Sequence, residues 1–312
     1  MLWFAPTVAW SARRVVRCWY HVPVMAEEVV EYLVTAPNGT YVDGTLGGGG
    51  HSAALLEKLG PSATVVGVDR DAAAIDFARS RVRDPRFRCV EANFDTIDIA
   101  CDGVLLDLGV SSKQLDDGGR GFSFRNEGPL DMRMGREGAT AWGIVNRMDE
   151  TEFSHLLRTF GEERLARRIA RAVARARPIE TTTQLAEVVE GVVPGPHKLK
   201  SVARVFQAIR LLVNDELGAL ERLLHKLPVI VNPGGRVVVI SYHSLEDRRV
   251  KRAIRSGRVD VRDPPKDHFG ANLSPWTDVL GSKAPLLPSQ AEIARNPRAR
   301  SAKLRVAQRR RR

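Results

Sequence analysis

The chain has 312 residues, of which 43% are hydrophobic and 27% are charged, so a disordered chain is excluded and an ordinary buried core is expected. This length corresponds to one large domain or two domains of moderate size. The formal net charge of +11 favours a polyanionic partner, nucleic acid first, and without a run of 18 apolar residues we expect no membrane-spanning helix.

Residues 1–20 form an N-terminal extension that we expect to be disordered. Its apolar residues precede its arginines, the reverse of a secretory signal, and it contains no acid. An organelle transit peptide and a start codon assigned too early are both compatible with this pattern. Cys18, Cys89 and Cys101 form neither a CxxC pair nor a disulfide framework, which favours a reducing, cytoplasmic location. We expect Cys89 and Cys101 to be small buried thiols.

Short apolar segments alternate with helix-like segments in the first part of the chain. We expect strands at residues 40–43, 64–69, 86–90 and 103–107. The segments HSAALLEKLG and DAAAIDFARSRV lie between the first three and have the apolar spacing of helices. This alternation predicts an α/β fold with a doubly wound parallel sheet.

The alternation stops after residue 107. The next predicted strand, GRVVVISY at 235–242, follows the turn NPGG and the helix-like segment NDELGALERLLHKL. More than a hundred residues separate these strands, whereas a crossover needs about a dozen. We therefore expect a mainly helical domain at 116–213, inserted into a first domain formed by 21–115 and 214–312.

The inserted segment contains two amphipathic stretches. In GEERLARRIARAVARAR, helical spacing places four arginines on one face, Arg164, Arg168, Arg171 and Arg175, beside an apolar stripe of Leu165, Ile169, Ala172 and Ala176. The arginines could bind RNA phosphates, or could form a solvated face balanced by Glu162 and Glu163. In KLKSVARVFQAIRLLVNDEL we expect Phe206, Ile209 and Val213 to be core residues.

The C-terminal segment is strongly basic. Residues 295–312 hold nine Lys and Arg side chains and no acid, and the chain ends in four arginines. A frayed tail and a nucleic-acid-binding arm both fit this composition. The segment RRVKR at 248–252 is a further candidate for phosphate contacts.

The glycine run in YVDGTLGGGGHS, residues 41–52, indicates a tight turn that comes close to a nucleotide-like cofactor. Gly47 and Gly49 fit the first positions of a dinucleotide fingerprint, but Ser52 occupies its third. Asp69, at the end of the second strand, is placed either to accept hydrogen bonds from ribose hydroxyls or to cap the helix that starts near Asp71.

The residues that follow the strands favour one class of enzyme. Asp43, Asp69 and Asp107 end strands one, two and four, and Phe94 follows strand three. This layout is typical of an adenosylmethionine-dependent methyltransferase. A nicotinamide oxidoreductase would need a hydride-transfer site, which the sequence does not indicate, and no HExxH, CxxC or carboxylate cluster predicts a metal site.

Five long segments carry a more specific resemblance: DLGVSSKQLDDGGRGFSFRNEGPLDMRM, FGEERLARRIARAV, FQAIRLLVNDEL, SYHSLEDRRVKR and NPRARSAKLRV. They resemble the signature blocks of the ribosomal RNA small subunit methyltransferase H family, bacterial enzymes that methylate a cytosine N4 in the decoding region. The resemblance runs from His21 to about Ala307, and is least clear at 259–294.

The resemblance implies S-adenosyl-L-methionine as cofactor and the small ribosomal subunit, with its 16S rRNA, as partner. It places Gly49, Gly50 and His51 in the cofactor loop, Asp69 on the ribose, Phe94 beside the adenine, and Asp107 and Gln114 near the methionine end. It also assigns the helical insert to substrate recognition. The oligomeric state stays open, a homodimer included.

Asp107 is the candidate catalytic residue, because an acid at the end of strand four could accept a hydrogen bond from the amine. Leu108, Gly109 and Val110 follow it, where many amino-methyltransferases have prolines and an aromatic residue. No cysteine is placed for ring-carbon methylation, which favours N4 chemistry.

Several alternatives stay open. His243 and Glu246 could touch the base or position a water, or could simply cap the next helix. A methyltransferase of this fold acting on another RNA or on a protein, and an inactive RNA-binding assembly factor, remain as alternative functions.

Overall fold

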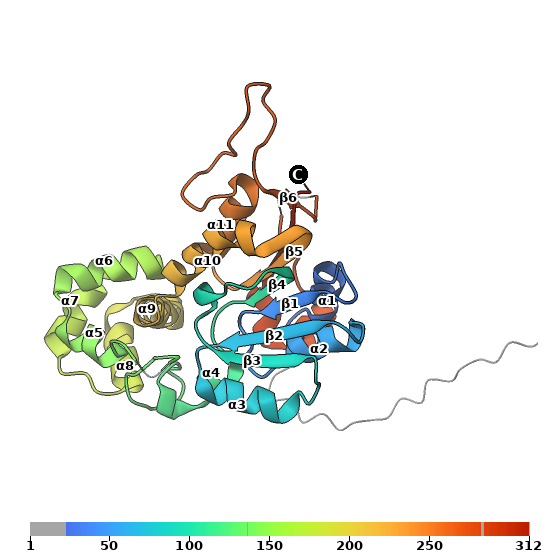
Figure 1. Cartoon of the computed structure of the whole chain (residues 1–312). Helices are drawn as coiled ribbons and strands as arrows, with labels where there is room; N and C mark the ends of the chain where they lie inside the picture. Colours follow the sequence, from blue (N-terminus) through green and yellow to red (C-terminus); the bar gives the residue numbers. More distant parts are fainter. Residues whose placement is uncertain (1–22, 136, 282–283, 312) are drawn as a thin grey trace, which may run out of the picture.

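The computed structural model describes residues 23–135, 137–281 and 284–311 (Figure 1). The predicted N-terminal extension with Cys18, and His21 where the resemblance begins, lie outside the described residues. A mixed sheet with flanking helices is joined to a unit made mainly of helices (Figure 1).

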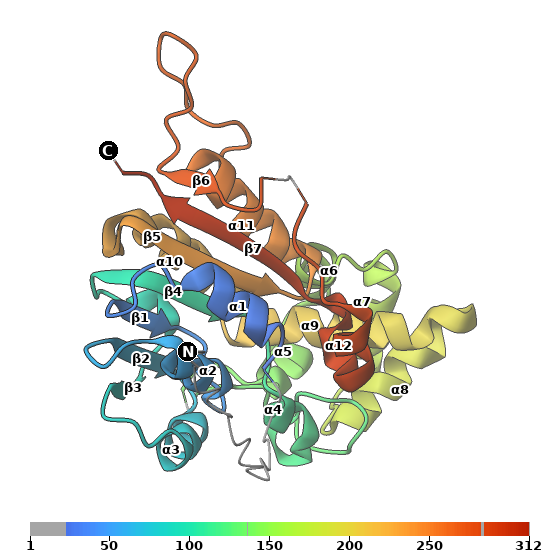
Figure 2. The same cartoon turned by 90° about the vertical axis from the view of Figure 1, so that its right-hand side faces the viewer.

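Seven strands form one sheet in the order β3-β2-β1-β4-β5-β7-β6 (Figure 2). Their bounds are β1 Thr40–Asp43, β2 Thr64–Asp69, β3 Phe87–Glu91, β4 Cys101–Asp107, β5 Val231–Ser241, β6 Trp276–Asp278 and β7 Lys303–Arg309. Strands β1 to β5 pair in parallel, and β7 runs antiparallel to both β5 and β6. The predicted doubly wound α/β sheet is confirmed, and its strand order reverses between β1 and β4.

Strand β5 begins earlier than the sequence predicts. It follows α10 (Glu216–Ile230) directly, and its pairing with β4 shifts from Cys101 opposite Val231 to Gly103 opposite Arg236. The turn-like NPGG segment therefore forms an irregularity inside the strand instead of preceding it.

The basic C-terminal segment is part of the sheet. Residues 303–309 form β7 between β5 and β6, with Leu304 and Val306 buried. Arg305 is also buried. Its charge is compensated there, because its Nε lies 2.7 Å from Asp247 Oδ1 on α11. For these residues the prediction of a frayed tail is wrong, while contact of the segment with nucleic acid stays a prediction.

Helices cover both faces of the sheet, and the side chains alternate between the faces as in any strand. Leu105 and Val238 pack in one cluster with residues of α1 and α2, whereas Val104 and Val239 pack in another with residues of α10 and α11. The helices outside the mainly helical unit are α1 Ala26–Leu33, α2 Gly50–Lys58, α3 Ala72–Arg81, α10 Glu216–Ile230, α11 Ser244–Ser256 and α12 Gln290–Arg295.

The helical unit has a hydrophobic core of its own, to which four of its helices contribute Phe153, Ile169, Leu185 and Phe206. Phe206 and Ile209 are buried there as expected, and Val213 is partly buried against them. The helices between β4 and α10 are α4 Ser112–Asp116, α5 Ala141–Arg147, α6 Glu150–Gly161, α7 Ala166–Ala176, α8 Thr182–Val192 and α9 Lys198–Val213. The buried core residues lie between Phe122 and Ile209, and the domain limits 116 and 213 stay a prediction.

Candidate functional site

A pocket lies at the carboxyl ends of β1, β2 and β4, where the strand order reverses and where α/β sheets bind ligands. The loop after β1 and the start of α4 form one side of it. The start of α10 and the turn after β5 form another. Residues from the sheet layer and from the junction with the helical unit therefore line the same space.

The glycine loop lines the pocket on one side and packs toward α3 on the other. Gly47 and Gly49 have left-handed backbones, with φ of +49° and +72°, which glycine adopts without a steric cost. Gly47, Gly48 and Gly50 line the pocket. Gly49 instead faces α3, where an added Cβ would lie 3.1 Å from Val82 Cγ2. Of the two predicted loop glycines, the structure thus places Gly50 at the pocket and Gly49 behind it.

Asp69 holds the glycine loop in place and lines the pocket. Its carboxylate accepts backbone N–H bonds from Gly47 at 2.8 Å and Asp71 at 2.9 Å. Burial raises the pKa of Asp69 to about 6, although the two backbone bonds act in the opposite direction. Asp71, and not Asp69, caps α3 by accepting from Ala73, so the capping alternative for Asp69 is wrong. A carboxylate has further lone pairs with which to accept from a ligand.

The residues after β3 form the next part of the wall. Phe94 begins a 3₁₀ turn, Phe94–Thr96, and lines the pocket beside Asn93. The Oδ1 atom of Asn93 is buried and has no hydrogen-bond partner among the residues that the structure describes. A buried acceptor without a partner is costly, so a donor on a bound ligand would relieve it.

Asp107 is oriented from two sides at the end of β4. Tyr242 donates its hydroxyl to Oδ1 at 2.8 Å, and Nε2 of His51 lies 3.4 Å from Oδ2. The backbone N–H of Asp107 donates to Thr45 Oγ1 at 2.6 Å. The carboxylate is thus fixed while part of it stays open to the pocket. The structure brings the predicted residues His51 and Asp107 together, whereas the role of Tyr242 was missed, although its position directly after β5 points to the cleft.

Burial and charge set the protonation of the residues around Asp107. Desolvation lowers the pKa of His51, but the bond to Asp107 and the nearby carboxylates outweigh it, so the net shift is upward. Burial raises the pKa of Asp43, to whose Oδ2 Ser52 donates at 2.8 Å. Burial and the charge of Asp107 raise the pKa of Tyr242 well above its usual value. At neutral pH Tyr242 therefore remains a hydrogen-bond donor.

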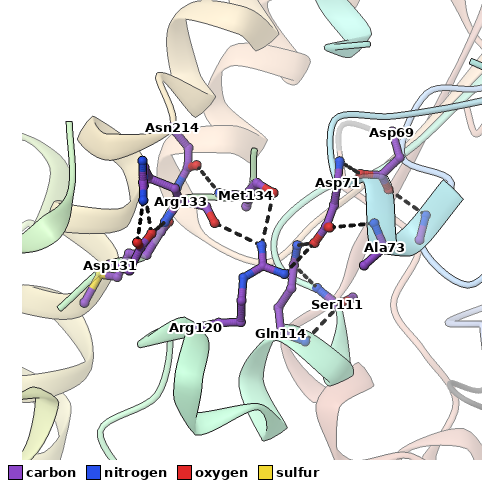
Figure 3. Close-up of polar contacts among 12 residues, drawn as sticks. Asp69, Asp71, Ala73, Ser111, Gln114, Arg120, Asp131, Arg133, Met134 and Asn214 are labelled. Atoms are coloured by element: carbon purple, nitrogen blue, oxygen red, sulfur yellow. Dashed lines mark hydrogen bonds and ion pairs between the residues drawn. The ribbon is translucent and has the colours of Figure 1, made fainter. Parts of the chain in front are cut away.

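Gln114 lies at the pocket, and its amide holds the surrounding loops (Figure 3). Its Oε1 accepts from the backbone of Ser111 at 2.9 Å, and its Nε2 donates to Asp71 Oδ2 at 3.0 Å. Arg120 donates to the same oxygen of Asp71 at 2.9 Å and to the carbonyl of Met134 at 3.1 Å. The end of β2 is thereby tied to the segment that leads into the helical unit.

Asn214 ties that segment to the junction of α9 and α10 (Figure 3). It is buried, accepts from the backbone of Met134 at 2.8 Å and donates to the carbonyl of Met132 at 2.8 Å. Met134 and Asn214 both line the pocket. This contact could not be predicted, because an amide between two helices is equally compatible with an exposed turn.

Comparison with known proteins decides the family. A model of the MraW methylase family matches residues 19–310. The chain belongs to the MraW methylase family. Its relatives include the ribosomal RNA small subunit methyltransferase H of Deinococcus radiodurans, 47% identical over 93% of this chain and 89% of the relative. The protein of the same name from Geobacter sulfurreducens is 45% identical over 92% of this chain and 98% of its own. The solved structure of an rRNA methylase from Streptococcus thermophilus matches with a TM-score of 0.38 and 11% identity, over 92% of this chain and 94% of that one.

S-adenosylmethionine is the cofactor of this MraW family member, and the pocket fits it. Asn93 offers a buried acceptor without a partner beside the aromatic ring of Phe94, as an adenine amine requires. Asp69 has lone pairs left for ribose hydroxyls. Asp107, which also lines the pocket, supplies a carboxylate for a sulfonium cation, whereas the carboxylate of Glu216 pairs with Arg210 at 2.8 Å.

Glu246 takes part in the cap at the start of α11. One of its carboxylate oxygens accepts from the backbone N–H groups of Tyr242 at 2.9 Å and His243 at 3.3 Å. The other lies 3.0 Å from Nε2 of His243. The prediction that His243 and Glu246 cap the next helix, α11, is confirmed.

The arginine face lies on α7, outside the lining of the pocket. All four predicted arginines are exposed, and Arg164 precedes the helix. The predicted apolar stripe is confirmed in part: Ile169 is buried and Leu165 packs partly buried against the core. The residues buried on α7 are Ala166, Ile169, Ala170 and Val173. Ala176 is exposed because the helix ends there.

The expected balance of the arginine face is also wrong. Glu163 is buried and lies 3.5 Å from Arg204, and Glu162 bonds to Ser244 and Arg248. The nearest acid to the face is Glu150, 3.7 Å from Arg171. Neither predicted acid therefore neutralises the four arginines.

The described cysteines do not line the pocket. Cys101 is buried, and burial raises the pKa of its thiol to about 12, while Cys89 is half-buried beside α3. Within the described ranges no group of three His, Cys, Asp or Glu side chains is placed to hold a metal ion. No helix in the described part of the chain is long and apolar enough to cross a membrane.

Proposed function

We propose that this chain transfers a methyl group from S-adenosylmethionine to the exocyclic N4 of a cytosine in the decoding region of 16S rRNA, in the small ribosomal subunit. The observation that carries the proposal is the carboxylate of Asp107, held by Tyr242 and His51 at the mouth of the cofactor pocket. The names of the relatives, which are ribosomal RNA small subunit methyltransferases, support the substrate.

The exocyclic amine of cytosine is a poor nucleophile because its lone pair is conjugated into the ring. The bound cofactor supplies an electrophilic methyl group with a neutral leaving group. Asp107 accepts a hydrogen bond from one N–H of the amine, which localises the lone pair on nitrogen. The same carboxylate accepts the proton that the nitrogen sheds once it carries the methyl group. Correct alignment of the amine supplies the rest of the rate acceleration.

Tyr242 and His51 position Asp107 for this role. Tyr242 holds one carboxylate oxygen at 2.8 Å, so the group cannot rotate freely about its Cβ–Cγ bond. Nε2 of His51 lies 3.4 Å from the other oxygen. A carboxylate held from both sides is a fixed acceptor for an amine N–H.

A cytosine in folded RNA must leave its stack before it can enter this pocket, which costs a few kcal/mol. Contacts with neighbouring phosphates offset that cost. The exposed arginines Arg164, Arg168, Arg171 and Arg175 are candidates for such contacts, in a helical unit that serves substrate recognition. Within the RRVKR segment, Arg248 and Arg249 already pair with Glu162 and Glu221, so that segment is a weaker candidate.

Methyl transfer to isolated subunits tests the proposal. Small subunits from a strain that lacks the modification are incubated with isotopically labelled adenosylmethionine, and the digested nucleosides are identified by mass spectrometry. We expect the label in N4-methylcytidine. Label in another nucleoside or in protein would support a methyltransferase with a different substrate. Absence of label with intact cofactor binding would likewise support another substrate, whereas failure to bind the cofactor would support an inactive assembly factor.

A further inference from the structure

A hairpin projects away from the sheet between α11 and β6 (Figure 1). We call residues 263–275 the projecting hairpin. Its two sides are joined by the bond from Leu273 N to Pro265 O at 2.8 Å and by antiparallel pairing of Lys266 with Asn272. Arg310, next to the end of β7, braces its base by donating to the carbonyl of Asn272 at 2.9 Å. The hairpin contributes no residue to the pocket lining.

The tip of the projecting hairpin presents an aromatic ring to solvent. Phe269 is 84% exposed, and its ring centroid lies 3.8 Å from that of His268. The carboxylate of Asp267 accepts backbone N–H bonds from Phe269 at 2.9 Å and Ala271 at 2.8 Å, and Gly270 completes the turn with φ of +85°. The turn therefore fixes the backbone that carries Phe269. Binding of a flat partner on this apolar ring is favourable, because it removes apolar surface from water.

Two cations lie in the hairpin or directly before it without an ion-pair partner among the described residues. Arg262 and Lys266 are exposed and have no ion-pair partner in the part of the chain that the structure describes. The nearby acids are already engaged: Asp260 pairs with Arg258 at 2.7 Å and Asp263 with Arg255 at 3.0 Å. Asp267 is held by backbone N–H groups of the turn. Lys266 in the hairpin and Arg262 directly before it thus remain available for an anionic partner.

We propose that the projecting hairpin is a second RNA-binding element, in which Phe269 stacks on an unpaired base and Arg262 and Lys266 contact the flanking phosphates. Exposed aromatic rings between cations bind single-stranded nucleic acid in this manner, because every base offers a flat face and every nucleotide a negative charge. The proposal rests on the proposed function, since it requires the substrate to be RNA. It gives the enzyme a contact outside the helical unit, which orients a large substrate from two directions.

Binding measurements with four variants test the proposal. Phe269→Ala, Phe269→Trp, Lys266→Ala and the control Val229→Ala are compared for affinity toward unmodified small subunits. Val229 is a matched control because it is 82% exposed and lies outside the hairpin. We expect Phe269→Ala to bind about 5- to 150-fold more weakly, the range that stacking of one base represents, and Phe269→Trp to bind as the wild type does. Lys266→Ala should reduce the slope of log affinity against log salt by about 0.7–0.9. Cofactor affinity should not change in any of the four.

Cross-linking identifies the partner. With a photoreactive benzoylphenylalanine at position 269, we expect the adduct on irradiated subunits to be digested by ribonuclease. An adduct with a ribosomal protein, or equal affinities for Phe269→Ala and Val229→Ala, would overturn the proposal and leave the proposed function standing. A wild-type protein that binds neither subunits nor rRNA would overturn both.

Discussion

If Asp69 binds the ribose of the cofactor, cofactor affinity should depend on pH. Its pKa is raised to about 6 by burial, and its ionised form is the one that accepts hydrogen bonds from ribose hydroxyls. Protonation below this pKa removes an acceptor, so the dissociation constant of adenosylmethionine should rise as pH falls. We expect binding about 10-fold weaker at pH 5 than at pH 8, measured by calorimetry. Asp69→Asn should bind weakly with no pH dependence over this range. If Asp69→Asn retained the wild-type profile, another acid such as Asp43 would be responsible.

Tyr242 acts through Asp107. Tyr242→Phe keeps the buried ring and removes the hydroxyl that holds Oδ1 at 2.8 Å. A hydrogen bond to a charged group contributes about 1.5–3 kcal/mol, so we expect kcat to fall about 10- to 150-fold. Single-turnover kinetics give the rate of methyl transfer, and calorimetry gives the cofactor affinity, which should stay within about twofold.

Asp107→Asn is the reference variant for this test, and it should lower the transfer rate further than Tyr242→Phe does. Equal losses of rate and of cofactor affinity in both variants would mean that the pair binds the cofactor and does not act on the amine.

Residues at strand ends could be predicted because their position follows from the alternation of strands and helices. Asp69 and Asp107 end β2 and β4, and parallel strands bring their carboxyl ends to one edge of the sheet. The roles of Tyr242 and Asn214 could not be predicted in this way. Their partners Asp107 and Met134 lie 135 and 80 residues away in the chain, and no local pattern reports such a pairing.

At the scale of elements, the segment between α4 and α5 depends on Asn214. This amide satisfies the backbone N–H of Met134 and the carbonyl of Met132, and Asn214→Ala would leave both buried groups without a partner. We expect the free energy of unfolding to fall by about 2–4 kcal/mol, measured by urea denaturation. Asn214→Asp keeps the acceptor for Met134 but turns a carboxylate oxygen toward the carbonyls of Met132 and Arg210, so its loss should be at least as large. A loss below about 0.5 kcal/mol in Asn214→Ala would show that the segment is held by Arg120 alone.

Strands were predicted correctly where their composition is typical of a strand. Strands β1 and β2 match their predicted ranges, and their residues are apolar and β-branched. Strand β7 was missed because Lys303, Arg305 and Arg309 give it the composition of a tail. Its alternation of Leu304 and Val306 with polar residues is the signal of a strand, and Arg305 is tolerated in the interior because Asp247 pairs with it.

At the scale of the whole molecule, charge is divided between pocket and surface. The chain carries a net charge of +11, yet Asp69, Asp107, Glu216 and Glu246 line the pocket. Glu216 pairs with Arg210 and Glu246 with His243, so Asp69 and Asp107 supply the carboxylates that face a cationic cofactor. Exposed arginines such as those of α7 attract a polyanionic substrate to the surface.

The arginine face of α7 supplies the last prediction. Arg168 and Arg175 are exposed, and no acid of the described chain forms an ion pair with either of them. If they contact phosphates, the double variant Arg168→Ala, Arg175→Ala should raise KM for the subunit and leave kcat unchanged. The slope of log affinity against log salt should fall by about 0.7–0.9 for each lost contact. Arg167→Ala is the matched control, because Arg167 is exposed on the same helix but lies off the predicted stripe. A purely solvated face would give the same small effect in both variants, and substrate recognition would then rest on other surfaces, the projecting hairpin among them.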